Sequence, residues 1–80
     1  MGKQDKALTE ALSLLESGDW QRAHAIVQAH ETQYACWLHG IVHVMENDLD
    51  NARYWYERAK RTFSSDAPAE LAAARAALEE

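Results

Sequence analysis

The chain has 80 residues, a net charge of −5 and 48% hydrophobic residues. The negative charge argues against general nucleic-acid binding, which depends on neutralising phosphates with Lys and Arg. No apolar run approaches the roughly 20 residues that span a bilayer, no signal peptide is visible, and the single cysteine, Cys36, excludes an intrachain disulfide. We therefore expect one small cytoplasmic domain with neither nucleic acid nor membrane among its partners.

Helical spacing of apolar residues predicts a first helix over about residues 3–17. Gly18 suits the left-handed conformation that often ends a helix. Asp19 is a favourable N-cap residue for a second helix, which ends near His30. These two predicted helices are close enough in sequence to pack as an antiparallel hairpin.

A second hairpin is predicted by the same signals. Thr32 is a suitable N-cap residue for a third helix over about residues 33–46, which is apolar nearly all round and is therefore expected to be buried on most sides. Asn47 ends this helix, and Asp48 caps a fourth helix whose apolar stripe runs to Phe63.

A last helix follows a polar break at residues 64–66, and Pro68 lies in its first turn, where the missing N–H costs nothing. We expect Leu71, Ala74 and Leu78 to face inward, and Glu70, Arg75, Glu79 and Glu80 to face outward. The predicted fold is all-α, with hairpin one at about 3–30, hairpin two at about 32–63 and a capping helix at about 67–79, in one domain over residues 1–80.

The two hairpins are related by an internal repeat with a shift of 29 residues. Small residues align with small ones, which suits helices that cross closely. A fixed-period repeat of helical hairpins is the signature of a solenoid. The aligned pairs include Ala7 with Cys36, Leu8 with Trp37, Ala11 with Gly40, Leu12 with Ile41, Gly18 with Asn47, and Ala23 with Ala52.

The spacing of Gly40, Ala52, Tyr56 and Ala59 resembles the tetratricopeptide repeat, and the turns at 18–20 and 47–49 are similar to that family's Gly-Asp-aromatic turn. The resemblance implies a right-handed superhelix of helical hairpins whose concave side commonly binds peptides. The period of 29 is shorter than the family's usual 34 residues. His39 stands where the family usually has Leu, and His43 where it usually has an aromatic residue.

Residues 35–59 are also similar to a group of short bacterial proteins of unassigned function. This narrower likeness covers about the middle third of the chain. It implies a bacterial tetratricopeptide-like protein and carries no activity with it.

Cys36, His39 and His43 follow one another at i, i+3 and i+7 and so share one face of the third helix. These residue types are ligands for zinc, copper or haem iron, and another helix would have to supply a further ligand, such as His24 or His30. The repeat register instead puts the three residues in the core, where buried histidines are usually hydrogen-bonded. We favour the core interpretation and predict no cofactor.

The candidate partner-binding residues form two groups. On the concave side of the array an apolar groove is expected, which either is filled by the chain's own first and last helices or accepts an apolar partner. The second group interleaves aromatics with a cation, the composition of interface hot spots, inside a stretch (51–65) with four bases and one acid. The candidates are Tyr34, Trp37, Ile41, Arg53, Tyr54 and Trp55.

No phosphate-binding loop or nucleophile motif is present, and the segment from His39 to His43 lacks the glutamate of a His-Glu-x-x-His metalloprotease. We therefore expect no enzymatic activity. The favoured function is a protein-interaction module, and because two repeats are fewer than usually stand alone, we expect a homodimer. The alternative is a small-ligand or metal-binding protein that uses the face of His39 and His43.

Overall fold

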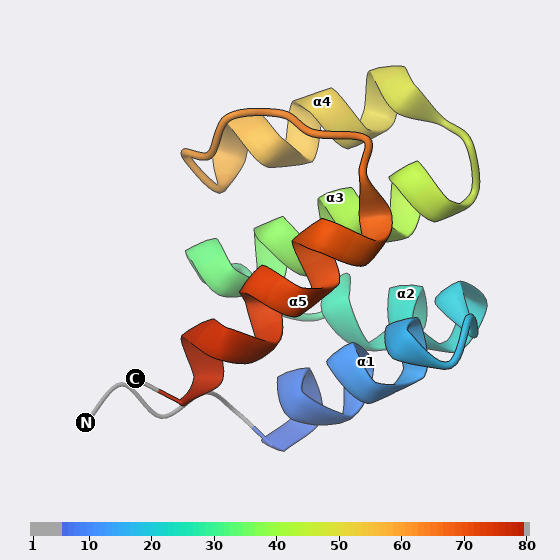
Figure 1. Cartoon of the computed structure of the whole chain (residues 1–80), viewed down its shortest axis with the longest axis vertical. Helices are drawn as coiled ribbons and strands as arrows, with labels where there is room; N and C mark the ends of the chain where they lie inside the picture. The colour runs from blue at the N-terminus through green and yellow to red at the C-terminus, as the bar shows by residue number, and fades with distance from the viewer. Residues whose placement is uncertain (1–5, 80) are drawn as a thin grey trace.

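A computed structural model describes residues 6–79, and within this range the chain forms five α-helices and no strand, which confirms the predicted all-α fold (Figure 1). No helix in the described part of the chain is long and apolar enough to cross a membrane. The expected beginning of the first helix at residues 3–5 lies outside the described residues. The helices are α1 (Lys6–Glu16), α2 (Trp20–Val27), α3 (Gln33–Met45), α4 (Leu49–Arg58) and α5 (Ala67–Leu78).

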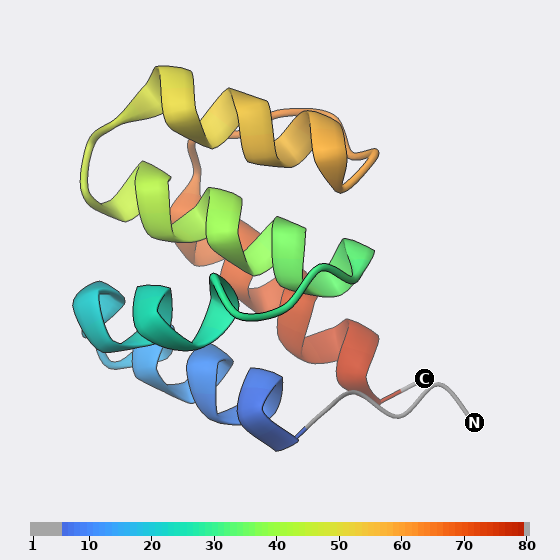
Figure 2. The ribbon, with the colours of Figure 1, turned by 180° about the vertical axis from the view of Figure 1, so that it is seen from behind.

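The helices stack as two pairs, and the fifth lies across them. α1 packs on α2 and α3 packs on α4, while α2 and α3 bring the two pairs together. α5 runs across one side of this stack and contacts α1 and α3, as seen from opposite sides in Figures 1 and 2. The central helix of the molecule is therefore α3, which touches each of the other four.

Three of the helices end in the same way. The second residue after each end has a positive φ, at Gly18 (91°), Asn47 (65°) and Lys60 (59°). In all three, the next amide donates a hydrogen bond to the carbonyl five residues back, at 2.8, 2.8 and 3.1 Å. This arrangement satisfies the last carbonyl groups of a helix and turns the chain away.

The third of these ends corrects the prediction for the fourth helix. The apolar stripe was expected to run to Phe63, but the left-handed residue Lys60 stops α4 at Arg58. Phe63 instead returns along α4, and its ring meets that of Tyr56 edge to face at a centroid distance of 5.4 Å. Lys has no special preference for a positive φ, so the sequence carried no signal for this turn.

The predicted caps hold in two places and fail in one. The side chains of Asp19 and Thr32 accept hydrogen bonds from the backbone N–H groups three residues on. Asp48 occupies the N-cap position of α4, but its side chain makes no capping bond there. It accepts a 3.2 Å hydrogen bond from the side-chain amide of Asn51 instead.

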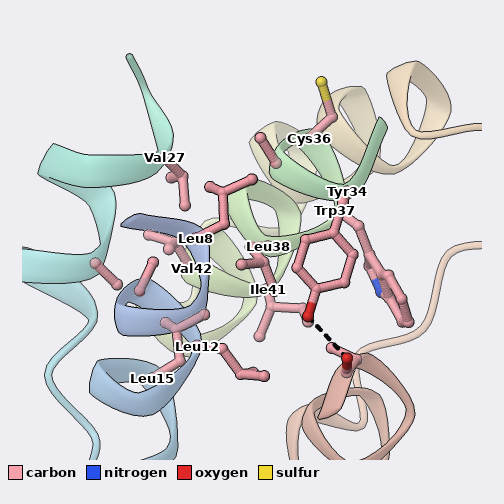
Figure 3. Packing of buried hydrophobic residues seen from close by; sticks show 14 of the residues in the cluster. Leu8, Leu12, Leu15, Val27, Tyr34, Cys36, Trp37, Leu38, Ile41 and Val42 are labelled. Carbon is pink, nitrogen blue, oxygen red and sulfur yellow. Dashed lines mark hydrogen bonds between the residues drawn. The ribbon is translucent and has the colours of Figure 1, made fainter. Parts of the chain in front are cut away.

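The core is built around α3, as its apolar composition predicts. Every residue from Tyr34 to His43 is buried. Leu8, Leu12 and Leu15 of α1 pack against this helix from the other pair (Figure 3). The chain thus buries its most apolar segment in its centre.

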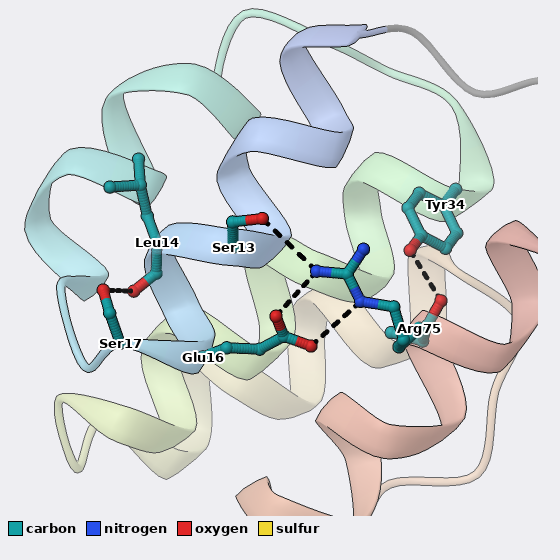
Figure 4. A network of polar contacts seen from close by, with 7 residues as sticks. Ser13, Leu14, Glu16, Ser17, Tyr34 and Arg75 are labelled. Atoms are coloured by element: carbon teal, nitrogen blue, oxygen red, sulfur yellow. Dashed lines mark hydrogen bonds and ion pairs between the residues drawn. The ribbon is translucent and has the colours of Figure 1, made fainter.

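Polar contacts fix α5 to the rest of the molecule. Two nitrogens of Arg75 donate to the carboxylate of Glu16 on α1, at 2.6 and 3.1 Å, and one also donates to Ser13 (Figure 4). Glu70, expected to face outward, is half-buried and points inward to α3 and α4. The expectation that Glu70 faces outward is therefore wrong.

Candidate functional site

The apolar groove expected on the concave side is filled by the chain itself. Tyr34, Trp37 and Ile41 are all buried, and the Tyr34 hydroxyl donates a 2.7 Å hydrogen bond to the carbonyl of Ala74 on α5 (Figure 3). Of the two outcomes expected for this groove, the structure has the first, with α5 as the occupant. A partner that binds these three residues would have to displace α5.

A carboxylate closes the same groove from the other side. One oxygen of Glu70, on α5, accepts hydrogen bonds from Trp37 Nε1 at 3.0 Å and from the Tyr56 hydroxyl at 2.7 Å. Burial and the hydrogen bond to this carboxylate both raise the pKa of Tyr56 above its usual range. Helices α3, α4 and α5 therefore meet at one acceptor atom.

The other three candidate partner residues remain at the surface of α4. Arg53 and Tyr54 are exposed and Trp55 is half-buried. Tyr54, with 49% of its surface exposed, is the one large hydrophobic residue that is exposed within residues 6–79. Arg58 holds it in position, since its Nη1 donates to the Tyr54 hydroxyl at 3.0 Å.

A groove lies beside this surface, at the beginning of α3 and just beyond the end of α4. It has a volume of about 550 Å³. The guanidinium of Arg61 lies 3.5 Å from the centre of the Trp37 ring, a cation–π contact at the wall of the groove. Its lining residues are Thr32, Gln33, Tyr34, Trp37, Ala59, Lys60 and Arg61.

Charge distinguishes this side of the protein from the rest. Residues 51–65 contain four bases and one acid, a net charge of +3. Because the whole chain carries −5, the remaining residues carry −8. α4 itself holds two acids and two bases, and Arg53 pairs with Asp50 at 3.6 Å. The excess of positive charge therefore lies just beyond α4, at Lys60 and Arg61 beside the groove.

A second cluster lies on the far side of α3, where three histidines converge. His24 comes from α2, and His39 and His43 come from α3. Their ring centroids are 4.9 to 5.3 Å apart, and one potential ligand nitrogen from each lies within 4.8 Å of the other two. His39 and His43 are 5% and 6% exposed, which confirms that both are buried.

Neighbouring side chains orient this histidine cluster. Nδ1 of His43 lies 2.7 Å from Oε1 of Glu46, a hydrogen bond from the ring to the carboxylate. The ring of His39 stacks on that of Trp55 from α4, at 3.8 Å between centroids and 9° between planes. Burial, together with the nearby charges of His24, His43 and Arg58, lowers the pKa of His39 to about 4. His39 is therefore neutral at neutral pH.

Cys36, the remaining predicted ligand, does not join the cluster. Its buried thiol lies one turn along α3 and its sulfur points away from the labelled core residues around it (Figure 3). It is not among the residues whose ligand atoms converge, whereas His24 is. His30, the other residue considered as an additional ligand, is also outside the convergent group.

The sequence did not predict the contacts of two glutamates, Glu46 with His43 and Glu70 with Trp37 and Tyr56. Glu46 was not considered as a partner of His43. Their i, i+3 spacing places two side chains close together near a helix end and could have indicated the contact. Glu70 was expected to face solvent, because helical periodicity does not show where the neighbouring helices lie.

Comparison with protein-family models, with curated proteins and with solved structures found no match for the chain.

Proposed function

We propose that this protein is a non-enzymatic interaction module that binds an acidic segment of a partner protein on the outer face of α4 and in the adjoining groove. The observation that carries the proposal is the exposed cluster of Arg53, Tyr54 and Arg58 within a stretch of net charge +3. Tyr and Arg are the residues that most often dominate binding energy at interfaces.

The chemistry of the partner follows from charge and shape. Lys60 and Arg61 are exposed at the groove, so a carboxylate there would meet two cations. Trp37 is buried under the guanidinium of Arg61, so the aromatic contact for a partner is the exposed ring of Tyr54. The excess of negative charge elsewhere on the protein repels an acidic partner from other faces and directs it to this one. An acidic peptide with one or two apolar side chains matches both features.

The helical pairs and their 29-residue repeat support kinship with tetratricopeptide proteins, which we include in the proposal. In this account α5 fills the side of the array that such proteins commonly use, and binding moves to α4. We also propose a cytoplasmic location in a bacterium, in keeping with a lone cysteine that is free and buried.

A peptide-display selection on the immobilised protein tests the proposal. We expect enrichment of peptides rich in Asp and Glu, with binding that weakens as salt increases because exposed charges are screened. Tyr54→Ala and Arg61→Ala should each weaken binding of a selected peptide by at least about tenfold, since hot-spot truncations cost on the order of 2 kcal/mol. Arg22→Ala, which removes an exposed arginine from α2, is the matched control and should leave binding unchanged.

Two results would overturn the proposal. One is a selection with no acidic enrichment, or with binding that Tyr54→Ala and Arg61→Ala leave intact. The other is sedimentation of the free protein as a dimer that these substitutions dissociate, because a second copy of the chain would then be the occupant of this surface. Circular dichroism of each variant shows that the helical fold is retained.

A further inference from the structure

We propose that His24, His39 and His43 form a binding site for a first-row transition-metal dication, with Zn²⁺ as the reference ion, and that Glu46 positions His43 within it. This proposal shares no ligand residue with the proposed partner surface and does not depend on it. Its three ligands come from two helices that belong to different helical pairs, α2 and α3. An ion here would therefore join the two halves of the molecule.

The geometry is close to that of a three-histidine site. The three nitrogens lie within 4.8 Å of one another. Nitrogens bound to a single tetrahedral zinc at 2.0–2.1 Å lie about 3.4 Å apart, so the rings need to close by roughly 1 Å. His24, which is half-buried and lies near the surface of α2, is the side chain with room to make this adjustment. A water molecule would complete the coordination.

The carboxylate beside His43 is the partner that metal-binding histidines usually have. The hydrogen bond between Nδ1 of His43 and Glu46 holds the proton on Nδ1 and leaves the lone pair on Nε2. Carboxylate–histidine–metal arrangements of this kind fix the tautomer and the ring orientation and raise the basicity of the ligand. His43 is only 6% exposed, so this pair differs from an ordinary ion pair between two solvent-exposed side chains.

His39 gives the second argument, because within residues 6–79 no protein group forms a hydrogen bond with its ring. Buried histidines normally have hydrogen-bond partners. His39 is 5% exposed, yet within residues 6–79 its contacts are ring stacking with Trp55 and with the other two histidines, and it has no hydrogen bond. No side-chain nitrogen in this range is both unpaired and completely shielded from solvent, so its nitrogens keep access to solvent. The His39 ring therefore has a nitrogen that no protein group occupies and that an ion can reach.

Charges around the cluster favour a cation on one side and oppose it on the other. Glu46 and Asp48 stand next to His43 on the side of the turn after α3. Arg58 faces His39 from α4, where its guanidinium lies 5.2 Å from the Trp55 ring.

Cobalt(II) is the probe that reports geometry directly. The full chain, freed of metal with a chelator and dialysed, is titrated with Co²⁺ and followed by visible absorption, and Zn²⁺ is titrated by calorimetry. We expect one ion per chain, the intense visible bands of tetrahedral Co²⁺, and their loss when Zn²⁺ displaces it. His24→Gln and His39→Gln should each abolish the bands, while His30→Gln, a histidine outside the cluster, is the matched control and should retain them.

Glu46 has its own test as a positioning residue. Glu46→Gln and Glu46→Ala should weaken Zn²⁺ binding by about 10–100-fold while the Co²⁺ bands keep their energies, because the ligands stay the same. A purely structural role for Glu46 would change stability but not metal affinity. Affinity is compared among variants whose helical circular dichroism matches that of the parent protein.

A second group of possible ligands must be distinguished from the three-histidine site. The carboxylates of Glu46 and Asp48 form a second convergent group with His43 at the surface. If Asp48→Asn abolishes binding and His24→Gln spares it, the ion occupies that group and the proposal is wrong. Absence of stoichiometric binding by the parent protein also overturns it. Because His24 is the least buried of the three, His24→Gln is the variant that best retains the fold.

Discussion

The hydroxyl of Tyr56 on α4 donates a 2.7 Å hydrogen bond to Oε1 of Glu70 on α5. Trp37 on α3 donates to the same oxygen at 3.0 Å. The backbones of α4 and α5 do not pack closely, so this carboxylate links α4 to α5. The hydrogen bond from Tyr34 to the Ala74 carbonyl adds a second polar link between the second helical pair and α5. The position of Glu70 explains how α5 stays packed against the second helical pair.

Glu70→Ala is therefore expected to lower the free energy of unfolding by about 2 kcal/mol, because hydrogen bonds to a charged group are strong and two donors lose their acceptor. Urea denaturation followed by circular dichroism measures this. Glu10→Ala, at an exposed position of α1, is the control and should change the free energy by less than about 0.5 kcal/mol. Equal effects of the two substitutions would show that the bridge contributes nothing.

The sequence was sufficient to predict the five helices, because their apolar periodicity is strong and residues that favour helix ends stand between them. Asp19 and Thr32 are N-cap residues, and Gly18 and Asn47 adopt the positive φ that ends a helix. The sequence was not sufficient for the end of α4. There the chain turns at Lys60, whose φ of 59° no local feature of the sequence predicts.

The candidate histidine site was only half visible from the sequence. His39 and His43 could be paired because i and i+4 on one helix are neighbours whatever the rest of the fold does. The contact of His24 with both depends on how α2 stacks on α3, and that stacking is decided by packing across the two helical pairs. Cys36 was included for its spacing along α3, which says nothing about the approach of α2.

The pair of Arg75 and Glu16 links α5 to α1 at the surface (Figure 4). The hydrogen bond from Arg75 lowers the pKa of Glu16, so its contribution to stability is present above the ordinary carboxyl pKa and disappears as the pH falls through the lowered value. Both side chains are 38% exposed, so Arg75→Ala should cost less than about 1 kcal/mol.

Thermal melts at low and high salt check this prediction. The difference between Arg75→Ala and the parent protein should shrink as salt increases, because the ion pair is screened. Arg75→Lys should recover only part of the loss, since an ammonium cannot make the two parallel hydrogen bonds that the guanidinium makes. A salt-independent difference would assign the effect to packing of the arginine stem.

Alkaline pH should destabilise the protein through Tyr34. Burial raises the pKa of Tyr34 to about 12, with the charge of Arg75 acting in the opposite direction and that of Glu16 adding to the rise. The unfolded chain therefore loses this proton near its ordinary pKa of about 10, while the folded chain keeps it. Between these two values stability falls as pH rises, by at most about 1.4 kcal/mol per pH unit from this group.

Tyr34→Phe separates this contribution from the others. At neutral pH the variant should be less stable by about 1 kcal/mol, because the hydrogen bond to the Ala74 carbonyl is lost. As the pH rises from about 10 toward 12 the difference should narrow or reverse, since Phe has no proton to lose. Denaturation midpoints measured across this range check it, and parallel pH profiles for the two proteins would contradict it.

Gly40 of α3 lies directly against Tyr56 and the Ala52 carbonyl of α4. A Cβ added at this position would lie 2.5 Å from Cδ1 and 2.8 Å from Cε1 of Tyr56, whose ring is buried and held by Glu70. Gly to Ala inside a helix normally stabilises by about 1 kcal/mol, but overpacking against a fixed ring costs about 1–3 kcal/mol. We therefore expect Gly40→Ala to destabilise the protein.

A double-mutant cycle tests whether the ring of Tyr56 is the cause. In a Tyr56→Leu background, where the ring is absent, Gly40→Ala should become neutral or stabilising, which gives a coupling energy of at least about 1 kcal/mol. Chemical denaturation of the four proteins measures this coupling. If Gly40→Ala stabilises the parent protein, α3 and α4 have room between them, and the close crossing predicted by the small residues of the repeat is wrong.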